Sequence, residues 1–173
     1  MSVKQRFQLV LVKPSHYDDD GYVIRWWRAI IPSNSLAAMY SIAADCAERQ
    51  ILGPDVAIAI EAIDETHTRV NVPKLLKRFR GHGNFGLVAL VGVQSNQYPR
   101  ALDIARPFRA AGIPVVIGGF HVSGCLSSWT AAPSTSMRAG TWAFRCSPAR
   151  PKVASNWCCR TPQPDVLLRF IIS

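Results

Sequence analysis

The fold is decided by residues 87–124, which read LVALVGVQSNQYPRALDIARPFRAAGIPVVIGGFHVSG. An apolar run comes first, a segment with apolar side chains at helical spacing follows, and a second apolar run ends at two glycines. Runs this uniformly apolar are typical of strands that are buried on both faces of a parallel sheet. The stretch therefore predicts a strand, a crossover helix and a second, parallel strand.

The same alternation extends back to the N-terminus. The predicted strands are 7–12, 55–63, 85–93 and 113–119, and the predicted helices are 33–52, 72–80 and 98–112. Pro107 lies inside the third predicted helix and should kink it or end it early. The order of elements predicts an α/β fold with a doubly wound, Rossmann-like parallel sheet of four to five strands.

The alternation stops near residue 126. Residues 127–173 show no sustained period, use Trp, Cys and Pro freely, and contain one acidic residue, Asp165. We expect an α/β domain over 1–126 and an irregular basic tail over 127–173. This composition is typical of a G+C-rich gene read out of frame, so the tail is predicted to be aberrant; a disordered or unusual surface tail is the alternative.

The net charge of +9 does not by itself indicate a nucleic-acid partner. Residues 1–126 hold 14 Lys/Arg against 10 Asp/Glu, whereas residues 127–173 hold 6 against 1, so the tail carries a disproportionate share of the excess. The basic cluster at 74–80 has the spacing of a solvated helix face.

No apolar run approaches the roughly 18 residues of a membrane span, the N-terminus lacks the features of a signal peptide, and the cysteines form no CxxC pair. We expect a cytoplasmic protein with reduced thiols.

Ligands of parallel sheets bind beside the carboxyl ends of the strands, which points to the loops KPSHYDDDG, AIDETHT, VQSNQ and GGFHVSG. In the first loop, the three acids after His16 suggest either a metal site or a solvated loop. In the second, Asp64 and Glu65 either bind ribose hydroxyls, as acids do in dinucleotide enzymes, or are ordinary loop residues. In the third, Ser95 either hydrogen-bonds a heterocycle or caps the next helix.

The fourth loop places Gly118 and Gly119 directly after a predicted strand. Glycines here let the backbone approach a ligand closely, or they only form a tight strand-to-helix turn. His121 is a candidate metal ligand or base. Because we find no Asp, Cys or His near it at ligand spacing, a loop histidine with a local hydrogen bond is the alternative. The sequence contains no GxSxG, Walker or HExxH motif.

Taken together, these loops resemble the cobalamin-binding domain that precedes the catalytic barrel in many radical S-adenosylmethionine proteins. The resemblance is carried by residues 9–45, LVLVKPSHYDDDGYVIRWWRAIIPSNSLAAMYSIAAD, and by the stretch 87–124 quoted above. It covers roughly residues 7–126. Its most specific part is the IARxxRxxGIPVVIGG run, which leads into the GG-x-H loop.

The resemblance implies a Rossmann-like domain that binds cobalamin, and with it the cobalt ion, with the nucleotide tail passing between sheet and helices. Gly118 and Gly119 would then line the path of the tail, and Ser95 would lie near its buried heterocycle. His121 matches the loop histidine of the family.

The chain also departs from the family in two places. Members that ligate cobalt through histidine carry DxHxxG after the first strand; Ser15 and His16 stand at that place here, without the supporting Asp or the closing Gly. This predicts cobalamin that receives no histidine ligand from the protein. The CxxxCxxC motif is absent too, so we expect neither an iron–sulfur cluster nor S-adenosylmethionine in this chain, and no activity of the chain alone.

The expected partners are cobalamin and either a separate catalytic domain or a second copy of the chain. Two other functions stay open from the sequence. One is a small α/β nucleotide-binding enzyme that uses Asp64, Glu65 and His121. The other is an interaction protein, either a ligand-free doubly wound regulatory module or a nucleic-acid binder that uses the basic tail.

Overall fold

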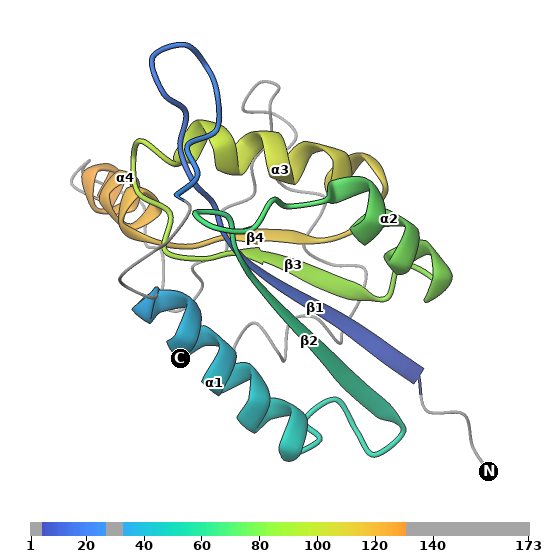
Figure 1. Ribbon diagram of the computed structural model, residues 1–173. Helices are drawn as coiled ribbons and strands as arrows, with labels where there is room; N and C mark the ends of the chain where they lie inside the picture. Colours follow the sequence, from blue (N-terminus) through green and yellow to red (C-terminus); the bar gives the residue numbers. More distant parts are fainter. Residues whose placement is uncertain (1–4, 27–32, 131–173) are drawn as a thin grey trace.

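The computed structural model describes residues 5–26 and 33–130, and within them four strands alternate with four helices (Figure 1). The strands are β1 (Gln5–Lys13), β2 (Val56–Asp64), β3 (Gly86–Leu90) and β4 (Val115–Ile117). The helices are α1 (Asn34–Glu48), α2 (Val72–Gly81), α3 (Tyr98–Ala110) and α4 (Phe120–Thr130). All seven predicted elements are present. The eighth, α4, occupies the GGFHVSG loop and the start of the predicted tail, the rest of which lies outside the described residues.

The four strands form one parallel sheet in the order β2-β1-β3-β4. Strand β1 pairs with β2 along its whole length, from Gln5 opposite Val56 to Lys13 opposite Asp64, so both strands end at the same edge. The chain moves from β1 to β2 in one direction and then crosses back past β1 to β3. The reversal between β1 and β3 confirms the predicted doubly wound α/β class.

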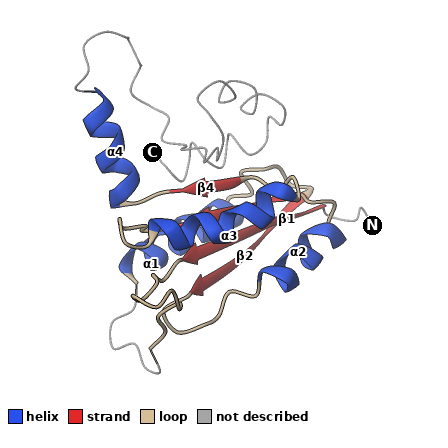
Figure 2. Ribbon diagram, turned by 90° about the horizontal axis from the view of Figure 1, so that it is seen from above, coloured by secondary structure: helices blue, strands red, loops and turns tan. Residues whose placement is uncertain are grey.

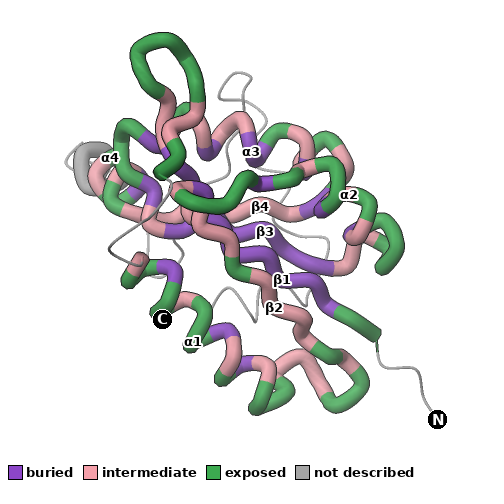
Figure 3. The backbone as a smooth tube through the Cα atoms, in the orientation of Figure 1, coloured by how far each residue is buried: buried purple, intermediate pink, exposed green. Residues whose placement is uncertain are grey.

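Helices cover both faces of the sheet (Figure 2), and each face has its own apolar cluster. Successive side chains of a strand point to opposite faces, which divides β1 between the two clusters. Leu9 belongs to the cluster that contains Leu36 of α1. Val10 belongs to the cluster that contains Phe79 of α2 and Phe108 of α3. Strand β3 is buried along its entire length, which explains its uninterrupted apolar sequence (Figure 3).

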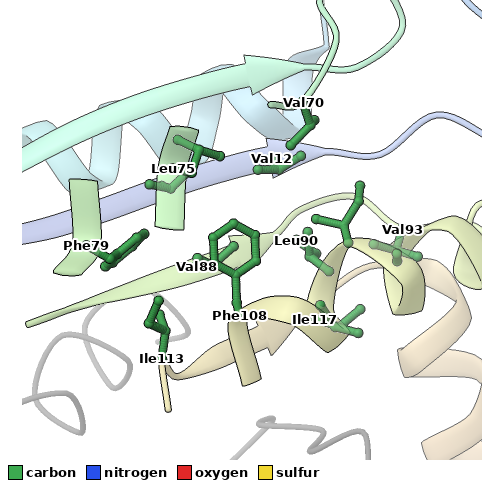
Figure 4. Packing of buried hydrophobic residues seen from close by; sticks show 14 of the residues in the cluster. Val12, Val70, Leu75, Phe79, Val88, Leu90, Val93, Phe108, Ile113 and Ile117 are labelled. Carbon is green, nitrogen blue, oxygen red and sulfur yellow. The ribbon is translucent and has the colours of Figure 1, made fainter. Parts of the chain in front are cut away.

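Phe79 and Phe108 join α2 to α3 over the sheet (Figure 4). Both side chains are fully buried, and their rings meet edge to face with centroids 6.0 Å apart. Helix α3 continues three residues past Pro107 to Ala110, so the predicted early end is wrong. Burial of Phe108 on the last turn stabilises that turn and offsets the backbone hydrogen bond that Pro107 cannot donate.

The strands β3 and β4 are shorter than predicted. Val91 and Val93 follow β3 and are buried at 6% and 0% exposure, although they lie in a loop. Apolar periodicity reports burial, and it cannot separate a buried loop from the strand that precedes it. Among the described helices, none is both long and apolar enough to cross a membrane.

Candidate ligand-binding site

The loops that follow β3 and β4 lie together at the carboxyl edge of the sheet. The backbone N–H of Gly118 donates to the carbonyl of Leu90 (2.9 Å), and that of Val93 donates to the carbonyl of Gly118 (3.0 Å). The N–H of His121 in turn donates to the carbonyl of Val93 (3.1 Å). These bonds continue the β3–β4 pairing beyond the strands and hold the first turn of α4 against the loop after β3.

Gly119 is required by this close approach. Its φ of +141° is a conformation that residues with a side chain rarely adopt. A Cβ at this position would lie 2.6 Å from the carbonyl oxygen of Val93 and closer still to its nitrogen. A Cβ at Gly118 would meet no atom within 4 Å. The backbone of Gly119 therefore packs directly against the backbone of Val93, whereas the space beside Gly118 is open.

A pocket of about 420 Å³ opens between the loop after β3 and the first turns of α4. Its lining residues are Ser95, Phe120, His121, Gly124 and Cys125. Most of them come from α4, which faces the loop because the hydrogen bonds described above fix its start. The Phe120 side chain is 77% exposed at the pocket. The volume lies in the range of small-molecule sites, roughly 300–1,000 Å³.

His121 is the central side chain of the pocket. Its Nδ1 lies 3.2 Å from Ser95 Oγ, and its Nε2 lies 3.7 Å from Cys125 Sγ. The ring of Tyr98 packs against the imidazole at 4.2 Å between centroids, tilted by 36°. His121 lies on the first turn of α4 rather than in the expected loop, and it contacts Ser95, 26 positions earlier, as well as Cys125 on its own helix. The premise that no Cys stands near it is wrong, because Cys125 is four residues further along the same helix.

Ser95 does not cap α3. The N-cap residue of that helix is Gln97, whose side chain makes no cap hydrogen bond. The Gln97 Oε1 instead accepts the backbone N–H of Gln94 (3.0 Å), which shapes the loop that carries Ser95. The serine is exposed, and its hydroxyl faces His121. Of the two roles that the sequence left open for Ser95, helix capping is therefore wrong.

Ser15 and His16 lie in the loop after β1, apart from the pocket lining. Ser15 is 1% exposed; its N–H donates to Glu65 Oε2 (3.1 Å) and its hydroxyl donates to the carbonyl of Ile24 (2.5 Å). The carbonyl of His16 accepts the N–H of Ile24 (3.0 Å). The N–H and the hydroxyl of Ser15 thus hold the loop after β1 in place.

Glu65 and Arg100 form an ion pair that the sequence analysis did not anticipate. Glu65, just after β2, is 1% exposed, and the Arg100 guanidinium at the start of α3 donates to both of its oxygens at 2.6–3.2 Å. Tyr17 extends the network, because its hydroxyl donates to Asp103 Oδ2 (2.6 Å) and accepts from Arg100 (3.4 Å). Glu65 is therefore engaged inside the protein rather than presented to a ribose.

The network shifts the pKa of two of its members. Burial and the hydrogen bond to Asp103 raise the pKa of Tyr17 above its ordinary value. For Arg100, burial lowers the pKa, but hydrogen bonds to Glu65 and Tyr17 outweigh this effect and raise it overall. Both groups keep their protons at neutral pH, so Arg100 stays a cation opposite Glu65.

The acids after His16 form a solvated turn. Asp18, Asp19 and Asp20 are exposed, and Asp18 Oδ1 accepts the N–H groups of Asp20 (3.1 Å) and Tyr22 (2.7 Å). Within residues 5–26 and 33–130, no three His, Cys, Asp or Glu side chains are grouped so that they could hold a metal ion. The exposure of all three acids agrees with the interpretation as a solvated loop.

Comparisons with protein-family models, with curated proteins and with solved structures gave no match.

Proposed function

We propose that the chain binds cobalamin at the carboxyl edge of its sheet, as the cofactor-binding part of a radical S-adenosylmethionine protein. The carrying observation is that Ser95, after β3, and His121, after β4, meet in one pocket at a distance of 3.2 Å. The resemblance assigns cofactor contacts to these same two loops. Open parallel sheets bind ligands in a crevice at this edge.

The residues of the pocket fit one part of cobalamin. A whole corrin with its nucleotide tail exceeds a pocket of about 420 Å³, so we assign the pocket to the heterocyclic end of the tail. That group is flat, apolar on its faces and polar at its edge. The exposed ring of Phe120 offers it an aromatic surface, and Ser95 Oγ offers it a hydrogen-bonding partner.

In this proposal, the expected contact residues other than His16 have two kinds of role. Ser95, Gly118 and His121 are open to a ligand and would hold the cofactor. Gly119 and Ser15 fix the loops instead, through close backbone packing and internal hydrogen bonds. Bound cobalamin would supply organometallic chemistry at cobalt, while the chain binds and orients it.

The proposal also places the protein in the cytoplasm. Cys46, which is buried, and Cys125, which is exposed, are both free thiols. Free thiols are usual in a reducing compartment.

The test is to mix the purified chain with hydroxocobalamin, desalt it and record the visible spectrum. A corrin chromophore that elutes with the protein in a near-stoichiometric amount is expected. Circular dichroism of the same sample verifies that the protein is folded. A folded but colourless protein overturns the proposal.

Substitutions in the pocket locate the site. A Cβ at Gly124 meets no atom within 4 Å, so Gly124→Leu fills the pocket while it suits the helix better, by about 1 kcal/mol. This variant should lose at least about tenfold in affinity, which corresponds to 1.4 kcal/mol. His82→Ala is the matched control, because His82 is exposed at the end of α2. Equal binding by Gly124→Leu and the control would remove the site from this pocket.

A further inference from the structure

Cys125 is paired with a base in the pocket. The side chains of residues four apart on a helix are neighbours, and α4 brings Cys125 Sγ to 3.7 Å from His121 Nε2. The thiol is exposed and lines the pocket of about 420 Å³, so a small molecule that enters the pocket reaches it. Cys46 lacks this setting: it is fully buried against the sheet, and burial is the main cause that raises the pKa of its thiol.

His121 is itself oriented by two neighbours on other elements. Ser95 Oγ lies 3.2 Å from Nδ1, and the Tyr98 ring packs on the imidazole face. When the Nδ1–H donates to the serine oxygen, the Nε2 lone pair is directed to the thiol. A nucleophile beside a base that a third group orients is the general arrangement of an activated side-chain nucleophile.

We propose that Cys125 is a nucleophilic thiol that forms covalent adducts with soft, electrophilic carbon compounds that enter the pocket. His121 Nε2 takes the Sγ proton, and the thiolate electron pair forms the new S–C bond. The leaving group departs with the electron pair of the bond that breaks, and the imidazolium then releases its proton to water. Ser95 is a positioning residue that acts through His121. This inference does not depend on cobalamin.

The test is the rate at which iodoacetamide alkylates Cys125 in the full chain at pH 7, with iodide as the leaving group. Peptide mass spectrometry resolves each cysteine. The reference is a synthetic peptide that spans residues 120–130, where only a few per cent of the thiol is ionised. Cys125 in the protein should react about tenfold faster than in the peptide, and Cys46 should react far more slowly than both.

Three variants at His121 and Ser95, together with one control variant, separate activation from simple exposure. His121→Asn keeps a polar side chain but removes the base, so the Cys125 rate should fall about tenfold, to that of the peptide. Ser95→Ala should reduce the rate two- to threefold, and Ser95→Thr should restore it, since it keeps the hydroxyl. His82→Ala should react like the original chain. The inference is overturned if folded protein and peptide react equally fast, or if His121→Asn leaves the rate unchanged.

Discussion

The Glu65–Arg100 ion pair is predicted to stabilise the folded chain, and removing one partner should lower the free energy of unfolding. The Glu65 carboxylate is almost completely removed from solvent, and its partners are three hydrogen bonds from Arg100 and one from the N–H of Ser15. The substitution Arg100→Met keeps the aliphatic stem but removes the cation. A buried carboxylate without its countercharge is then left at the carboxyl edge.

The expected cost follows from this burial. Breaking a buried ion pair from one side typically costs about 3–5 kcal/mol. Because the N–H of Ser15 still reaches Glu65, we expect a value near the lower end for Arg100→Met, about 3 kcal/mol. Glu65→Gln retains an acceptor for Ser15 but weakens the pair with Arg100, and it should cost about 1–2 kcal/mol in the original chain.

The effect of Glu65→Gln on the free energy of unfolding should change sign when Arg100→Met is already present. With Arg100→Met already present, Glu65→Gln removes an unpaired buried charge and should return about 1–2 kcal/mol. Urea denaturation of the four proteins, followed by circular dichroism, gives the free energies of unfolding for this double-mutant cycle. If Glu65→Gln destabilises both backgrounds by the same amount, the two residues are not energetically coupled and the reasoning is refuted.

Three further predictions use the same denaturation assay. Gly119→Ala should cost at least about 1–3 kcal/mol from backbone strain alone, whereas Gly118→Ala, with open space and no positive φ, should stay within about 1 kcal/mol of the original; equal effects would contradict the assigned roles. Phe108→Ala, which empties a fully buried site, should cost about 3–5 kcal/mol, and a cost below about 1 kcal/mol would contradict its place in the core. The raised pKa of Tyr17 means that the folded chain keeps a proton that the unfolded chain loses near pH 10.0, so stability should be full below that pH and fall above it. Tyr17→Phe should be less stable at pH 8 by about 1 kcal/mol, because the hydrogen bond to Asp103 is lost. Its stability should, however, fall less than that of the original chain between pH 10 and 11. Parallel curves of stability against pH would exclude the raised pKa of Tyr17.

The sequence predicts the fold well because the uninterrupted apolar runs of this chain coincide with its strands. The central strands of a sheet that is covered on both faces are apolar on both faces, and the runs that include Leu9 and Val88 meet this requirement. The sequence does not show at which residue the hydrogen-bonded pairing of the strands ends. Val93 is as apolar as a strand residue because its loop is packed under α4, and no local pattern distinguishes the two cases.

The site was predictable in part. Ser95 and His121 were each identified, because both follow strands whose carboxyl ends meet at one edge. The contact of His121 with Cys125 was missed because the GGFHVSG stretch was interpreted as a loop. The i, i+4 spacing of His121 and Cys125 becomes a signal only once residues 120–130 are known to be helical. The Glu65–Arg100 pair joins residues 35 apart, and only the relative position of β2 and α3 brings them together.

The network and the pocket divide the carboxyl edge into two halves with different roles. The general rule for open parallel sheets places a ligand at the reversal of strand order, which lies between β1 and β3. In this chain the polar groups on the β1 side are already used: the N–H of Ser15 binds Glu65, its hydroxyl binds the Ile24 carbonyl, and Arg100 closes the cluster. A ligand that displaced them would have to compensate for a buried charge. On the β3–β4 side, the His121 imidazole contacts Ser95 and Cys125 at 3.2–3.7 Å and packs on the Tyr98 ring, at a pocket that solvent reaches. Replacing these exposed contacts with ligand contacts costs less free energy than displacing the partners of a buried charge. Ligand binding is therefore expected on the β3–β4 side, while the loop after β1 stays fixed beside it.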